Sequence, residues 1–103
     1  MDSIVLSGVF GGDFLVFKSP VEFEIKKEGK NYVINRPDLG IYAFDEDLND
    51  LKEELEYEIM LACNVYVCRD EKELMGGEKK IRNKLLELIE SITCPTICEE
   101  PLS

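Results

Sequence analysis

The sequence predicts an α+β fold, with a mainly antiparallel sheet of about five strands and two helices packed on one face. Two patterns support this prediction. Before position 45, β-branched, aromatic and alternating segments are typical of half-buried strands. From Leu48 onward, apolar residues recur with the period of an amphipathic helix. A chain of 103 residues suffices for one domain in which each strand buries one face and each helix one stripe.

Glycine or proline turns separate the expected strands. These strands are Ser3–Phe10, Asp13–Phe17, 21–28, Tyr32–Asn35 and Ile41–Phe44. The clearest is VEFEIKKE at 21–28, where Val21, Phe23 and Ile25 alternate with charged residues and predict one buried face. The pair Gly11-Gly12 can supply the positive φ angles of a two-residue hairpin turn.

The first helix is expected to begin at Leu48, with Asp47 as its N-cap. An aspartate suits this place because its carboxylate accepts hydrogen bonds from unpaired N–H groups of the first turn. Asp50 follows three residues later, where a complete capping box has Glu or Gln. The apolar stripe of this helix is Leu48, Leu51, Leu55, Ile59 and Ala62, and the helix is expected to fade in 64–68.

A second helix is expected over Glu78–Ile92, after a break at Gly76-Gly77. Its apolar face is Ile81, Leu85, Leu88, Ile89 and Ile92. The single domain is therefore expected to span 1–92, followed by an irregular tail at 93–103.

The formal net charge of −10 argues against direct binding of nucleic acid, whose phosphates need clustered Lys and Arg, and against anionic membrane surfaces. A basic partner would be attracted instead. The N-terminal apolar run lacks a basic flank and is interrupted at positions 11–13, so we expect no export signal, no membrane span and a cytoplasmic location.

Eight carboxylates fall between positions 45 and 58, against the single cation Lys52. They are Asp45, Glu46, Asp47, Asp50, Glu53, Glu54, Glu56 and Glu58. Three interpretations stay open: a solvated helix face, a surface that binds a partner, or a metal or catalytic site. The candidate partner-binding residues are Glu53, Glu54, Glu56 and Glu58. The cations of the second helix, Lys79, Lys80, Arg82 and Lys84, are expected to lie near this segment and offset its self-repulsion.

No catalytic residue, metal site or cofactor is predicted. The chain has no histidine, which excludes Ser-His and Cys-His pairs, and it contains no phosphate-binding glycine motif. The four cysteines, Cys63, Cys68, Cys94 and Cys98, are spaced C-x4-C and C-x3-C, unlike the C-x2-C of structural zinc sites. We expect free thiols, with zinc binding or a disulfide as alternatives.

One part of the chain resembles the N-terminal domain of HicB-type antitoxins. The segment KKEGKNYVINRPDLG is followed, as in that family, by a short strand, an acidic helix cap and a Glu-rich helix. Tyr32-Val33, the bend at 37–40 and Leu48 fit the family frame, and 45–47 occupy its Gly-Asp-Thr positions. The resemblance covers roughly Pro20–Leu61. An even closer one is to small prokaryotic HicB-like proteins that carry an extra N-terminal hairpin before the same core.

The resemblance implies a truncated ribonuclease H-like fold without catalytic carboxylates and a partner role. Family members cover a small basic ribonuclease toxin of the HicA-like kind and block its RNA-binding surface. The sequence lacks the second proline of the bend, has Asp45 in place of glycine, and shows no DNA-binding module after the second helix. We therefore expect a non-catalytic interaction module, with self-association through a sheet edge as a further option. The alternatives are a thiol-based metal or redox protein, a divalent-metal nuclease, and an interaction protein without a toxin partner.

Overall fold

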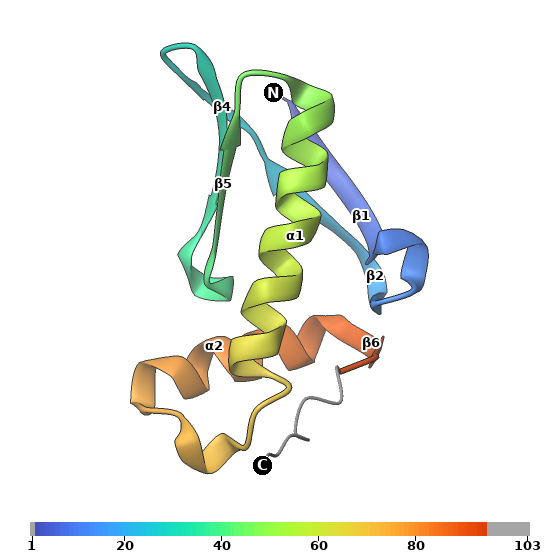
Figure 1. Cartoon of the computed structure of the whole chain (residues 1–103), viewed down its shortest axis with the longest axis vertical. Coiled ribbons are helices and arrows are strands. Elements are labelled where there is room, and N and C mark those ends of the chain that lie inside the picture. The colour runs from blue at the N-terminus through green and yellow to red at the C-terminus, as the bar shows by residue number, and fades with distance from the viewer. Residues whose placement is uncertain (1, 95–103) are drawn as a thin grey trace, which may run out of the picture.

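The computed structural model describes residues 2–94 and contains two antiparallel three-stranded sheets and two α-helices (Figure 1). One sheet has the order β1-β2-β6, with β1 at Ser3–Val9, β2 at Leu15–Glu24 and β6 at Ile89–Ile92. The other has the order β3-β4-β5, with β3 at Lys26–Glu28, β4 at Asn31–Arg36 and β5 at Ile41–Asp45. Helix α1 is Leu48–Tyr66 and helix α2 is Gly76–Leu88. The α+β class is confirmed, but the single sheet of about five strands is wrong.

The expected strand at 21–28 is divided between the two sheets at Ile25. Before this point Glu24 pairs with Ser3 of β1, and after it Lys26 pairs with Val33 of β4. The Ile25 N–H donates to the Asp2 carbonyl at 2.9 Å, so the crossing residue keeps a backbone partner. The division gives two short sheets, and each can turn an apolar face toward α1.

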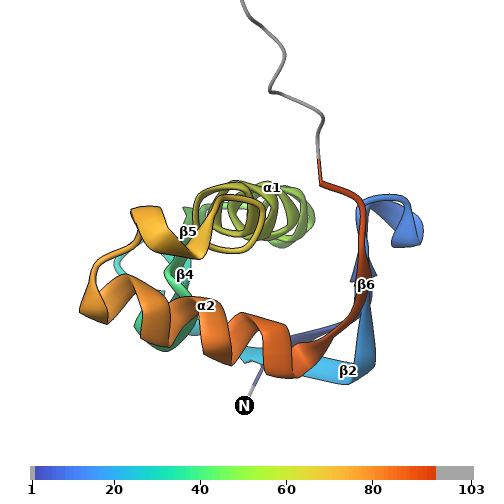
Figure 2. The same ribbon diagram turned by 90° about the horizontal axis from the view of Figure 1, so that it is seen from below.

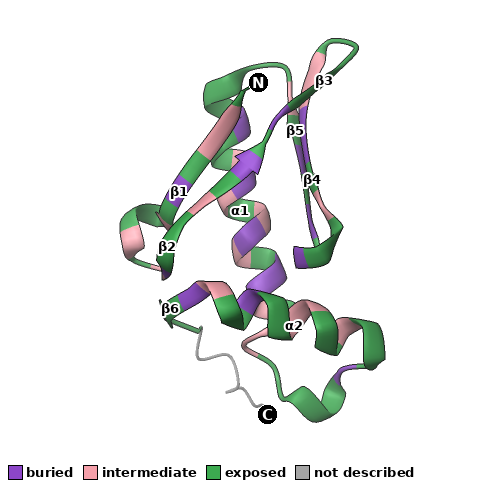
Figure 3. Ribbon diagram, turned by 180° about the vertical axis from the view of Figure 1, so that it is seen from behind, coloured by how far each residue is buried: buried purple, intermediate pink, exposed green. Residues whose placement is uncertain are grey.

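The core lies between the sheets, and α1 runs along one side of it (Figure 2). The helix packs against β5 and also contacts β1 and β4. Leu51, Leu55, Ile59 and Ala62 are buried as the stripe predicted, and Figure 3 shows the buried residues on the inward side of the helix. Leu48 is 43% exposed, because it is the first residue of the helix and lies at its outer end.

The second helix is shorter than predicted. Gly76 and Gly77 begin α2 instead of breaking the chain, and the Met75 N–H donates to the Glu78 carboxylate at 2.9 Å. The helix ends at Leu88, and β6 then pairs with β2, Leu15 opposite Ile92. The physical reason is a tertiary contact. The edge of β2 provides backbone hydrogen-bond partners for 89–92, a stretch with β-branched residues that would otherwise continue the helix.

A disulfide joins Cys68, just after α1, to Cys94, just after β6. The expectation of free thiols is therefore wrong for these two residues. Cys63 is a buried free thiol, and burial raises its pKa to about 12, so it is a packing residue rather than a nucleophile. Cys98 and most of the expected tail lie outside the described residues, while Thr93 and Cys94 have no regular structure.

Candidate docking surface on helix α1

The first turn of α1 uses two of the eight carboxylates. The Asp47 carboxylate accepts hydrogen bonds from the N–H groups of Asn49 at 2.8 Å and Asp50 at 3.2 Å, as an N-cap does. The Asp45 carboxylate accepts from the Asp47 N–H at 3.0 Å. This bond takes the place that Asp50 would have filled in a complete capping box.

Three of the four candidate partner-binding residues line one groove beside α1, and the fourth, Glu58, lies outside it. Glu53 is exposed, and Glu54, Glu56 and Glu58 are half-buried. Glu53, Glu54 and Glu56 line this groove, which faces the turn after β1. Glu54 and Glu58 are one helical turn apart, so they share a face of the helix.

The groove between α1 and the turn at Phe10–Gly12 has a volume of about 600 Å³. Its lining consists of carboxylates and two aromatic rings: Phe10, Asp45, Asp50, Glu53, Glu54, Glu56 and Tyr57. The Phe10 N–H donates to the Glu56 carboxylate at 3.3 Å, which ties the turn to the helix. Phe10 has a φ of +55°, uncommon for a bulky residue, and its side chain is 40% exposed. The groove therefore combines negative charge with accessible aromatic surface.

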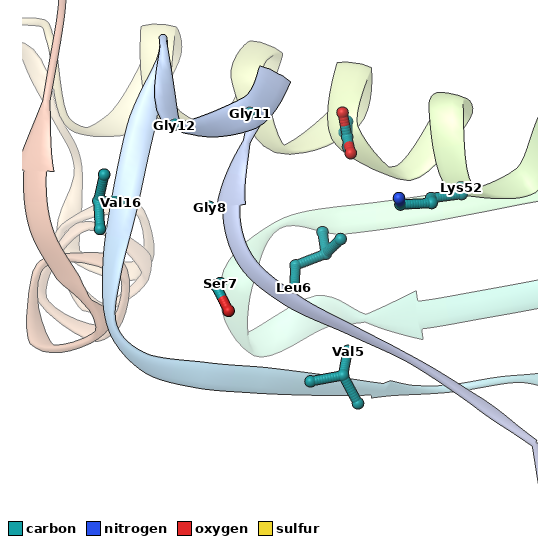
Figure 4. A pocket seen from close by; sticks show the side chains of 9 residues that line it. Val5, Leu6, Ser7, Gly8, Gly11, Gly12, Val16 and Lys52 are labelled. Atoms are coloured by element: carbon teal, nitrogen blue, oxygen red, sulfur yellow. The ribbon is translucent and has the colours of Figure 1, made fainter.

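The charges of this face repel one another. Partial burial raises the pKa of Glu58, and the nearby Glu54 carboxylate raises it further. No cation lines the groove. Lys52 lines a neighbouring hollow of about 420 Å³ between β1 and α1, and Glu56 lines both this hollow and the groove (Figure 4). Within residues 2–94 the one ion pair joins Arg36 to Asp38, at 3.1 Å. Within the described residues, none of the carboxylates at 45–58 therefore takes part in an ion pair.

The expectation that cations of the second helix offset the acidic segment is wrong. Helix α2 packs at the C-terminal end of α1, whereas the carboxylates occupy its N-terminal half (Figure 1). Arg82 Nη1 donates instead to the carbonyls of Tyr66 at 3.2 Å, Val67 at 2.9 Å and Arg69 at 3.2 Å. This cation satisfies carbonyls that the helix end leaves unpaired.

Sequence reasoning missed an apolar stripe on the outward side of α1. Tyr57, Leu61 and Val65 are 50%, 38% and 40% exposed, and their spacing of four places them along one side of the helix. The signal was present in the sequence, because these residues are offset from the buried stripe and cannot join it. Glu54 and Glu58 border the stripe. An apolar strip with a charged rim is the anatomy of a protein-binding surface.

Between Asp2 and Cys94 no group of three or more Cys, Asp or Glu residues is placed to hold a metal ion. Neither α1 nor α2 is long and apolar enough to cross a membrane.

Comparisons with known proteins add no information about this surface. The sequence matches no protein-family model and no curated protein, and the structure matches no solved structure.

Proposed function

We propose that this chain is a non-catalytic protein-interaction module whose α1 face binds a small basic protein. The observation that carries the proposal is the groove on α1, which is lined by five carboxylates and no cation, beside the exposed stripe of Tyr57, Leu61 and Val65. A solvated helix face accounts for the carboxylates but not for three large apolar residues in line. A basic partner accounts for both, since its charges meet the carboxylates and its apolar residues cover the stripe.

The partner class follows from the charge and from the HicB resemblance. Residues 45–58 carry seven of the ten net negative charges of the chain. A small basic ribonuclease toxin of HicA-like type has the matching sign, because a basic surface that attracts RNA phosphates also attracts carboxylates. In this proposal Glu53, Glu54, Glu56 and Glu58 provide the negative field, and the stripe provides the apolar contact.

Association kinetics test the charged half of the surface. The probe is the product of the adjacent reading frame, and the variant is Glu53→Gln/Glu54→Gln/Glu56→Gln/Glu58→Gln. We expect association about tenfold slower at low salt, a nearly unchanged dissociation rate, and a smaller difference as salt is raised. Glu71→Gln/Glu73→Gln/Glu87→Gln/Glu90→Gln is the matched control, because it removes four exposed charges elsewhere.

A second variant tests the apolar half. Tyr57→Ala/Leu61→Ala should mainly speed dissociation, because it removes contacts that form only in the complex. Equal association rates for wild type and the four-fold Gln variant would show that the carboxylates of the acidic face are only solvated and do not contribute to binding. Absence of binding by the adjacent product would remove the antitoxin assignment.

A further inference from the structure

We infer that the free edge of β5 pairs with β5 of a second copy of this chain, in an antiparallel two-fold dimer. This surface is separate from the face of α1 proposed to bind a basic protein. It is formed by the outer side and the unpaired edge of the β3-β4-β5 sheet. Within residues 2–94 no strand is hydrogen-bonded to β5 on the side away from β4.

Among the four edge strands, β5 alone lacks a feature that blocks edge pairing. Strand β1 has a register shift between Leu6 and Gly8. Strand β3 consists of three exposed charged residues, and β6 is four residues long with an irregular register against β2. Charges, bulges and short length are the usual protections of a sheet edge. Strand β5 pairs with β4 in an unbroken register and has one charged residue, Asp45, at its end.

The outer side of β5 is also aromatic. Ile41 and Ala43 point into the core, whereas Tyr42 is 49% and Phe44 51% exposed. Their rings lie 5.7 Å apart between centroids. If two copies pair about Ala43, Tyr42 of each copy stands opposite Phe44 of the other. Aromatic pairs directly across antiparallel strands are stabilising, and this register opposes no like charges within β5.

Charge complementarity selects a second copy as the occupant. Strand β5 begins beside the Pro37–Leu39 turn, which packs on α2, and ends at the acidic start of α1. Helix α2 carries four cations and two carboxylates, a net charge of +2, and the acidic start of α1 at 45–50 carries a net charge of −4. An antiparallel pair therefore brings the acidic end of each copy toward the α2 end of the other. Such an interface is self-complementary, as two-fold symmetry requires.

Sedimentation velocity of the full chain over a wide concentration range tests the dimer. Tyr42→Lys/Phe44→Lys places like charges directly opposite one another across the pair, and we expect it to raise the dimer dissociation constant about tenfold or more. Val5→Lys is the control, because Val5 is 57% exposed on the other edge strand β1. Circular dichroism of each variant establishes that it is folded.

A second pair of variants tests the charge arrangement without touching β5. Lys80→Glu/Lys84→Glu should weaken the dimer more than Lys18→Glu/Lys30→Glu, although both change the net charge equally and all four lysines are exposed. A wild-type chain that stays monomeric at every concentration overturns the inference. The inference is also overturned if the strand that pairs with β5 belongs to another protein. An unchanged dimer dissociation constant in Tyr42→Lys/Phe44→Lys also overturns it. So does an equal increase of this constant in Lys80→Glu/Lys84→Glu and in Lys18→Glu/Lys30→Glu. Binding by the α1 face is tested independently by the variants at Glu53, Glu54, Glu56, Tyr57, Glu58 and Leu61, which leave β5 and α2 unchanged.

Discussion

The two ends of α1 solve the same physical problem in different ways. At the N-terminus, N–H groups of the first turn are satisfied by Asp47, and Asp45 holds the cap in turn, so every partner is a chain neighbour. At the C-terminus, the carbonyls of Tyr66, Val67 and Arg69 accept from Arg82, at least thirteen residues away along the chain. The disulfide from Cys68 to Cys94 fastens the same end.

This difference separates charges that stabilise the fold from charges that remain available. Arg82, Asp47 and Asp45 are each engaged by backbone groups of the protein itself. Of the other carboxylates between positions 45 and 58, only Glu56 has a hydrogen bond of this kind, to the turn at Phe10. We therefore expect the C-terminal end of α1 to matter most for stability and its acidic face to matter most for binding.

The largest loss of stability is expected at the disulfide. Cys68→Ser/Cys94→Ser opens a link across a sequence separation of 26 residues and should lower the free energy of unfolding by about 3.5 kcal/mol, mainly by freeing the unfolded chain. Chemical denaturation measures this change. In reductant, the wild-type protein should have the same free energy of unfolding as the variant. An equal free energy of unfolding of the wild type with and without reductant would contradict the prediction.

A smaller loss is expected at Arg82. Arg82→Ala leaves carbonyls at the end of α1 without their donor and should lower the free energy of unfolding by about 2 kcal/mol. Lys79→Ala is the control, because it removes the same charge from an exposed position on the same helix. Equal denaturation midpoints for the two variants would show that Arg82 acts only as a surface charge.

The smallest of the three effects is expected at the N-cap. Asp47→Ala should cost about 1 kcal/mol, since one short-range cap is lost while Asp45 and the buried stripe remain. Asp47→Ser keeps an acceptor in place and should recover most of the loss. The stabilities of both variants are compared by thermal unfolding. An Ala variant as stable as wild type would mean that water accepts the hydrogen bonds of the first-turn N–H groups as well as Asp47 does.

Much of the candidate site follows from local sequence. The start of α1 at Leu48, the cap at Asp47 and the buried stripe depend on residues within a few positions of each other, so periodicity and capping chemistry predict them. The acidic segment was equally visible. Its surroundings were not, because the groove includes Phe10, which lies forty-six residues from its partner Glu56.

The sequence by itself determined the α+β class, the two strands on either side of the bend at Pro37–Leu39, and the acidic start of α1. Only the tertiary structure decided that the strand at 21–28 divides at Ile25, that Ile89–Ile92 leave the helix for the edge of β2, and that Cys68 pairs with Cys94. The physical reason is the distance along the chain between the residues that interact. Turns, caps and apolar periods are set by neighbours in the chain, whereas a strand edge, an Arg82 donor or a second thiol becomes a partner only after distant segments have packed together.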